Sequence, residues 1–261
     1  YNPAWAAFLI NRQVGLSYSS MSLDRRLSGL SFATPLPPTA GLGVSWVSAG
    51  VTDIQGRNSA GKKTTMMQTG EDALMISFAQ RILPWFSFGA NIKILQNQLP
   101  INESYKGSGI GFDIGFLFKS GNSTTFGLMI QDINSMYNWD SGDLYAEGRI
   151  YSEYFPTIYR LGTKFLYKNI LVVADAGFIT NYRLGKEISD DTFVSLLPRI
   201  GIEYTYLDLY YIRGGLGNGR IAFGWGLQYD LIKNHDSRID YTFSMDWASQ
   251  LSHTLSYGFN F

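Results

Sequence analysis

The sequence contains no cysteine, so the protein has no disulfide bond. This absence is compatible with an envelope protein, but many other proteins also lack cysteine. Nowhere do about 18 apolar residues run together, which excludes a membrane-spanning helix. The 21 Lys and Arg residues balance the 21 Asp and Glu residues, which argues against a nucleic-acid partner. Helical periodicity is nearly absent as well. With 261 residues, the chain is long enough for one large β domain.

Histidine is scarce, with only His235 and His253 in the chain. His235 falls in an expected turn. Ser252 and His253 are neighbours on an expected strand, so their side chains point to opposite faces and cannot act as nucleophile and base. No motif calls for a metal ion or a cofactor. The sequence therefore predicts a protein that is not an enzyme and that has neither a metal site nor a cofactor site.

Alternation of apolar with small or polar residues recurs along the whole chain. From Phe86 to Leu95, for example, Phe, Phe, Ala, Ile and Ile occupy every second position. Most of the segments have about 10 to 14 residues, which a tilted strand needs to cross a bilayer, whereas soluble strands usually have about five or six. Dividing the chain in this way predicts fourteen strands, at 12–21, 23–36, 41–51, 72–83, 86–99, 109–120, 123–135, 156–168, 170–181, 196–207, 209–217, 219–232, 237–248 and 251–261.

The connections between these strands differ in length in a regular way. Short connections follow every even-numbered strand, and long ones follow the third, fifth, seventh and ninth, at 52–71, 100–108, 136–155 and 182–195. An even strand count, with the long loops on one side and both termini on the other, is typical of outer-membrane proteins. The sequence therefore predicts an all-β fold, a 14-stranded antiparallel transmembrane β-barrel of the bacterial outer membrane, over residues 12–261.

Aromatic residues gather where such a barrel would meet the two membrane interfaces. Trp85, Tyr204 and Tyr206 are among those beside the short turns. A second group lies toward the long loops and comprises Trp46, Tyr137, Trp139 and Trp247. Two girdles of lipid-facing aromatic side chains are therefore expected.

The charged residues of the predicted strands fall on one face, and the other face is almost wholly apolar. Because a charge facing lipid at mid-membrane costs about 2–4 kcal/mol, the charged face is expected to line the lumen. Two interpretations are open, because the charges could pair across the lumen and occlude it or could line a polar conduit. The expected lumen-lining residues are Arg81, Lys93, Asp113, Gln131, Arg160, Lys164, Asp175, Arg199, Glu203, Arg213, Asp230, Arg238 and Asp240.

The last predicted strand is apolar on one face and small or polar on the other, and it ends on an aromatic residue. Outer-membrane barrels present such a strand to the machinery that assembles them. The residues expected to act as this assembly signal are Leu255, Tyr257, Phe259 and Phe261.

Several passages resemble one known superfamily. The segment Tyr1-Asn2-Pro3-Ala4-Trp5 resembles the Asn-Pro-Ala segment of the hatch in the FadL fatty-acid transporter superfamily. Passages that are similar to its PorV/PorQ-like branch are Ser45–Arg57, Phe86–Lys93, Gly111–Gly115 and Gln131–Asn134. The resemblance implies a fourteen-stranded barrel in which Asn2, Pro3 and Ala4 take part in a hatch or gate. Members of the superfamily carry a longer stretch ahead of this segment, so residues 1–11 are expected to form a hatch remnant.

The superfamily divides on function, and both functions are carried forward. The first is passive transport of a hydrophobic or amphipathic small molecule across the outer membrane. The alternative is an accessory or scaffold barrel, with an occluded lumen, in a larger envelope or protein-secretion assembly. The expected partners are membrane lipid, lipopolysaccharide and the outer-membrane assembly machinery, together with a hydrophobic ligand in the first case or an envelope protein in the second. No nucleic acid is expected.

Overall fold

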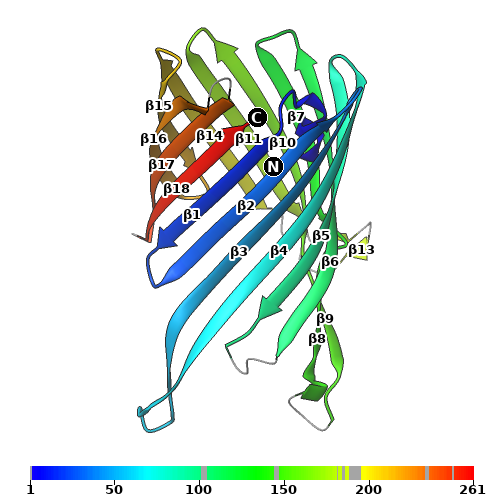
Figure 1. The fold of residues 1–261 in the computed structure, drawn as a ribbon. Coiled ribbons are helices and arrows are strands. Elements are labelled where there is room, and N and C mark those ends of the chain that lie inside the picture. Colours follow the sequence, from blue (N-terminus) through cyan, green and yellow to red (C-terminus); the bar gives the residue numbers. More distant parts are fainter. Residues whose placement is uncertain are drawn as a thin grey trace.

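The computed structural model describes residues 2–100, 105–143, 147–180, 182–183, 186–187, 195–232, 235–248 and 250–261. Sixteen strands share one sheet, and all of them but β8 and β9 form a closed barrel, which leaves fourteen barrel strands (Figure 1). All strand pairs in it are antiparallel, and the pairs β1–β18 and β5–β6 close the ring. The predicted fold is confirmed. No helix in the described ranges is long and apolar enough to cross a membrane.

The barrel strands match most of the predicted segments within a few residues. They are β1 (Gln13–Met21), β2 (Arg25–Leu36), β3 (Ala40–Arg57), β4 (Lys63–Leu83), β5 (Phe86–Gln98), β6 (Lys106–Ser120), β7 (Thr124–Ile133), β10 (Thr157–Tyr167), β11 (Ile170–Thr180), β14 (Ser195–Tyr206), β15 (Tyr210–Gly217), β16 (Arg220–Ile232), β17 (His235–Asp246) and β18 (Leu251–Asn260).

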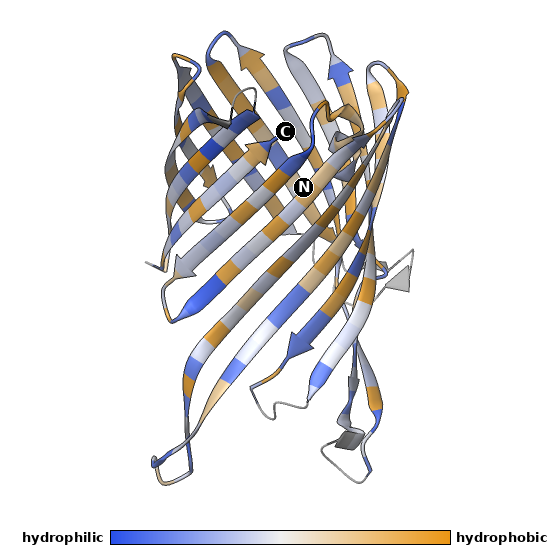
Figure 2. Cartoon of the chain, in the orientation of Figure 1, coloured by the Kyte–Doolittle hydropathy of each residue, from blue (hydrophilic) through white to orange (hydrophobic). Residues whose placement is uncertain are grey.

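Alternation along each strand sorts the side chains between the lumen and the outer surface. On β5, Ile92 and Ile94 are 49% and 51% exposed on the outside, whereas Asn91 and Lys93 are 5% and 7% exposed on the inside. Figure 2 shows apolar residues recurring along the strands around the whole wall. Such an apolar surface is stable only against lipid or another apolar partner, which is why a barrel of this sequence needs a membrane.

Both termini lie at one end of the barrel (Figure 1), together with the short connections β2–β3, β4–β5 and β6–β7, and we call this the hatch end. The opposite end is the loop end. The last strand, β18, pairs with both β1 and β17, and Leu255 on it is 57% exposed on the outer face. A role of this strand as the assembly signal stays a prediction.

The connection expected at 52–71 is wrong, because β3 and β4 continue as a paired hairpin far beyond the predicted strand ends. Their pairing reaches Arg57 and Lys63, with register shifts between Val51 and Ile54 and between Gln55 and Arg57. Beyond the apolar part of the wall, both faces of a hairpin can be polar, so the alternation that marks a spanning strand disappears while the backbone pairing continues.

The other long connections are described only in part. Residues 136–155 contain a second hairpin, β8 (Met136–Asp140) with β9 (Ile150–Tyr154), and the short 3-10 segment η2 (Ser141–Asp143). Two short paired strands, β12 (Tyr182–Arg183) and β13 (Lys186–Glu187), occur in the connection at 182–195. Most of that connection, the loop residues 101–104, the turn residues 233–234 and Tyr1 lie outside the described residues.

Candidate functional site

A short segment ahead of β1 folds into the barrel at the hatch end (Figure 1). It is the 3-10 helix η1 (Pro3–Phe8), and Asn2 caps it by accepting a 3.0 Å hydrogen bond from the backbone nitrogen of Ala4. The amide nitrogen of Asn2 also donates to the carbonyl oxygens of Phe116 on β6 and Leu128 on β7, both at 3.0 Å. The side chain of Asn2 therefore caps the N-terminus of η1 and also attaches the segment to the wall.

Glycines on the inner face of the wall let η1 approach the sheet closely. A Cβ atom at Gly41 would lie 1.9 Å from a carbonyl oxygen of η1, and one at Gly89 would lie 2.6 Å from one of its backbone nitrogens. A Cβ at Gly115 would lie 2.1 Å from the side-chain oxygen of the asparagine cap. The hydroxyl of Ser87 donates a 2.9 Å hydrogen bond to the carbonyl of Ala4, which is completely buried. We call these three glycines the glycine floor.

We call residues 2–9, which fold into the lumen, the hatch, and a cavity of about 780 Å³ lies between it and the wall of the barrel. On the hatch side, Trp5 and Leu9 border it, and it reaches Asn91 on β5 and Asp240 on β17. Its volume lies in the range of about 300–1,000 Å³ that accommodates small-molecule ligands. Much of its border along β1, β2 and β3 consists of small residues, namely Gly15, Ser17, Gly29, Ser31, Gly43 and Ser45.

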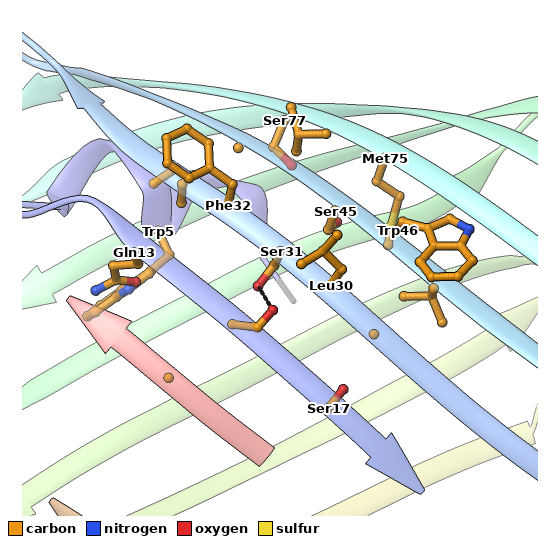
Figure 3. A pocket seen from close by; sticks show the side chains of 18 of the residues that line it. Trp5, Gln13, Ser17, Leu30, Ser31, Phe32, Ser45, Trp46, Met75 and Ser77 are labelled. Carbon is orange, nitrogen blue, oxygen red and sulfur yellow. Dashed lines mark hydrogen bonds between the residues drawn. The ribbon is translucent and has the colours of Figure 1, made fainter. Parts of the chain in front are cut away.

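The wall beside this cavity is thin. Leu30 and Phe32 on β2 and Trp46 on β3 belong to the outward face, yet they border the same cavity as Ser31 and Ser45 (Figure 3). Side chains of one or two heavy atoms add little to the thickness of the backbone on the inner face. The pairing of β1 with β2 and of β2 with β3 nevertheless runs without a register shift, so the wall is thin here but continuous.

The other side of the lumen carries paired charges. Lys93 on β5 is 7% exposed and lies 2.6 Å from the carboxylate of Asp113 on β6, and it also pairs with Asp132 on β7. The amide of Asn91 donates to the second oxygen of Asp113 at 3.1 Å. This cluster joins three consecutive strands of the wall.

Arg160 on β10 makes the next connection around the wall. It pairs with Asp175 on β11 at 2.7 Å and donates to Gln131 on β7 at 3.1 Å. Arg199 on β14 lies opposite Asp175 in the strand register.

A third group occupies β14 to β17. Arg213 pairs with Glu203 and, at 2.7 Å, with Asp240, while Arg238 reaches the same two carboxylates at 3.2 and 2.9 Å. Arg213 passes over Gly226, where a Cβ atom would lie 2.2 Å from the carboxylate of Asp240. In the described part of the chain, each ion pair lies along the wall, within one strand or between strands no more than three apart. These residues therefore do not pair across the lumen.

Three further residues of the expected lumen set lie near the hatch end. Arg81 on β4 and Lys164 on β10 lie beside the aromatic rings of the hatch. Asp230 on β16 is opposite Asp236 in the strand register. The structure thus gathers the expected residues into separate clusters around one lumen rather than into a single site.

The expectation of a complete aromatic girdle toward the loop end is wrong for Tyr137 and Trp139. Both lie on β8 and are buried, with 3% and 6% of their surface exposed, against Leu95 of β5. A Cβ atom at Gly107 on β6 would lie 2.7 Å from the indole ring of Trp139. Positive φ angles at Asp132 and Asn134 turn the chain between β7 and β8, which brings the hairpin against the inner face of β5 and β6. Alternation alone does not report such a turn.

Hydrogen bonds hold this hairpin at the mouth. The phenol of Tyr137 donates to the carboxylate of Glu71 on β4 at 2.5 Å, and the indole nitrogen of Trp139 donates to Glu153 on β9 at 3.0 Å. Burial, together with the hydrogen bond to Glu71, raises the pKa of Tyr137 above its ordinary value of 10.0. The phenol therefore stays protonated, and keeps donating this hydrogen bond, up to a higher pH than an ordinary tyrosine.

We expect Tyr137→Phe to weaken the attachment of the β8–β9 hairpin by about 0.5–1.5 kcal/mol, the net worth of one hydrogen bond. Amide exchange over Met136–Asp140 should then be roughly two- to tenfold faster. Tyr151→Phe is the matched control, because Tyr151 is 67% exposed on β9. Equal exchange in the two variants would show that the Glu71 contact does not hold the hairpin.

The hydrogen bond between Tyr137 and Glu71 should also make the amide exchange of β8 depend on pH. Because the pKa of Tyr137 is raised in the folded protein, its contribution to stability is complete below pH 10 and declines as the pH rises further. Hydrogen exchange of β8 in the native chain should therefore quicken above pH 10 beyond the intrinsic effect of base. Tyr137→Phe should remove this additional increase.

A closed antiparallel barrel of fourteen strands and an apolar outer surface together define the fold of an outer-membrane barrel, and the N-terminal segment of this one folds into the lumen. No protein-family model matches the sequence, and no curated protein matches it.

Several solved structures of FadL-type outer-membrane channels share this fold. The Pseudomonas putida toluene transporter TodX has a TM-score of 0.68 at 14% identity over 100% of this chain and 92% of its own. A Pseudomonas aeruginosa FadL homologue has a TM-score of 0.69 at 12% identity, again over 100% and 92%. The Ralstonia pickettii toluene transporter TbuX has a TM-score of 0.65 at 14% identity over the same shares. At these identities the likeness shows the fold, and the resemblance to the PorV-like branch stays a prediction.

Proposed function

We propose that this protein lies in the bacterial outer membrane and passively transports a hydrophobic or amphipathic small molecule. The observation that carries the proposal is the cavity of about 780 Å³ between the hatch and the thin wall of β1 to β3. The names of the similar structures, two toluene transporters and a FadL homologue, support the same class of cargo.

The two sides of the lumen suit this task differently. Paired charges keep their hydrogen bonds to one another, so an apolar molecule passing them leaves no charge unpaired. The small residues of β1 to β3 leave room for the cargo and expose little that needs to bind water. The hatch is attached through a few hydrogen bonds of Asn2 and Ser87 rather than through a strand of the barrel, so it is the part suited to move.

We expect Ser31→Trp to reduce uptake at least several-fold, because an indole on the inner face of β2 would fill part of the cavity. The measurement is uptake of labelled toluene and labelled octanoate by cells that have an intact lipopolysaccharide layer and produce the barrel. Ser28→Trp is the matched control, since Ser28 lies on the outward face of the same strand, opposite Tyr18 of β1. Uptake that is equal in cells with and without the unmodified barrel would exclude transport of these two molecules.

One observation favours the alternative, an accessory barrel in an envelope or secretion assembly. Beyond the barrel rim, β3 pairs only with β4, so Thr52–Arg57 and Lys63–Thr69 present unpaired strand edges at the loop end. Such edges can accept a strand from a partner protein. Mass spectrometry of the barrel purified from native membranes separates the two functions. A copurifying lipid-like ligand without a stoichiometric protein supports transport, and a stoichiometric protein with an empty lumen supports the accessory role.

A further inference from the structure

Three inward-facing cations gather at the hatch end, and within the described residues none of them pairs with a carboxylate. They are Arg81 on β4, Lys119 on β6 and Lys164 on β10. The ion pairs among the described residues all belong to the three clusters farther along the wall, and none includes these three side chains. Each of the three is only partly exposed.

The three cations surround the two aromatic rings of the hatch. The Nζ atom of Lys119 lies 3.6 Å from the ring centroid of Phe8 and 5.4 Å from that of Trp5. The guanidinium of Arg81 lies 5.8 Å from the Phe8 ring, and the Nζ atom of Lys164 lies 5.6 Å from the Trp5 ring. The two ring centroids are 6.3 Å apart, so cations from β4, β6 and β10 converge on one pair of rings.

Contact with a ring face attracts each cation but leaves its charge in place. Three like charges gathered at a half-buried site repel one another more strongly than they would in bulk water. An anion placed among them removes that repulsion and accepts hydrogen bonds from one guanidinium and two ammonium groups.

We propose that Arg81, Lys119 and Lys164 form a binding site for a small oxyanion, a phosphate or a carboxylate, beside the hatch. None of the three cations lines the cavity of the proposed function, so the site is separate from that cavity. The two are neighbours, because Trp5 borders both. Because the same three groups hold Trp5 and Phe8, a bound oxyanion draws them from the rings and loosens the hatch. Anion binding and hatch movement are thereby coupled.

Calorimetric titration of the full chain in a zwitterionic detergent with inorganic phosphate, at an ionic strength held constant with chloride, tests the site. Unmodified protein should bind phosphate saturably. The variant Arg81→Gln/Lys119→Gln/Lys164→Gln should bind it at least about tenfold more weakly, since a single charge-assisted hydrogen bond is worth about that factor. The variant Arg57→Gln/Lys62→Gln/Lys63→Gln removes the same charge from the β3–β4 hairpin and should bind like the unmodified protein. Equal affinity in all three proteins would overturn the site.

A single cysteine at position 7 reports the hatch, because the chain has no other cysteine and Ala7 is only 4% exposed. Maleimide should label Ala7→Cys faster when phosphate or octanoate is present, whereas octanol should not change the rate. Acceleration by octanoate alone identifies the oxyanion as the head group of an amphiphile, and acceleration by phosphate identifies a free anion. No acceleration by either would overturn the coupling. Heat-modifiable mobility verifies folding, and if the triple variant fails to fold, Lys119→Gln alone replaces it. Neither experiment depends on transport of a hydrophobic cargo.

Discussion

Gly89→Val should displace the hatch from the wall. A Cβ at position 89 would lie 2.6 Å from the backbone nitrogen of Ala4 and 2.7 Å from the carbonyl carbon of Pro3, both backbone atoms that cannot rotate away. Overpacking of this kind costs about 1–3 kcal/mol, which would shift the equilibrium between a docked and a released hatch by roughly 5- to 150-fold. Thiol labelling of Ala7→Cys in this background should quicken by a factor in that range.

Gly258→Val is the matched control. Gly258 faces the lumen from β18 and borders the same cavity, but a Cβ there meets no atom within 4 Å. In the Gly258→Val background, the labelling rate of Ala7→Cys should equal the rate without a valine substitution. Both valine variants should retain the heat-modifiable mobility of a folded barrel. If Gly89→Val labels as slowly as the control, the glycine floor does not hold η1 in place.

Phe243→Lys should strongly impair insertion of the barrel into a bilayer. Phe243 lies on β17 opposite Phe223, which is 63% exposed on the outer face. A lysine that faces lipid near the midplane costs about 2–4 kcal/mol, which corresponds to a change of well over tenfold in the ratio of folded to unfolded protein. Urea titration of folding into phospholipid vesicles measures this difference.

Thr242→Lys provides the comparison, because Thr242 is the neighbouring residue on the same strand and faces the lumen beside Gly224. There the ammonium group meets water and other polar groups, so the loss of stability should be much smaller. Similar losses in the two variants would mean that the inside and outside assignments of β17 are exchanged, since a shift of one residue turns every side chain to the other face.

The spanning strands could be predicted because a bilayer imposes the alternation that marks them. Segments such as 86–99 and 109–120 are apolar on every second residue, and the structure places strands there. Between Val51 and Gly70 that constraint is absent, so a paired hairpin with polar residues on both faces looked like a loop. Tyr137 and Trp139 looked like girdle residues for a related reason. Their composition is right for an interface, but backbone turns at Asp132 and Asn134 decide where they point.

The hatch was predictable in part. Asn2, Pro3 and Ala4 stood out through the resemblance of their segment to a known hatch, and the structure places them in the lumen. The glycine floor did not stand out, because Gly41, Gly89 and Gly115 occupy inward positions where any small residue would fit the alternation. Their role depends on how closely a distant part of the chain approaches them. Lys119 was part of the same alternating pattern, and only its distance from Phe8 distinguishes it.

The unequal distribution of ion pairs has a mechanical consequence. In the described part of the barrel, the seven ion-pair contacts lie within β5 to β17, and none of them involves β18 or β1 to β4. Satisfied polar networks stiffen the segments they connect. The barrel therefore has a stiff arc and a compliant arc, and the compliant arc includes the thin wall of the cavity. A molecule too large for the resting cavity would widen the barrel by bending β1 to β3 outward, while the stiff arc kept the cylinder closed.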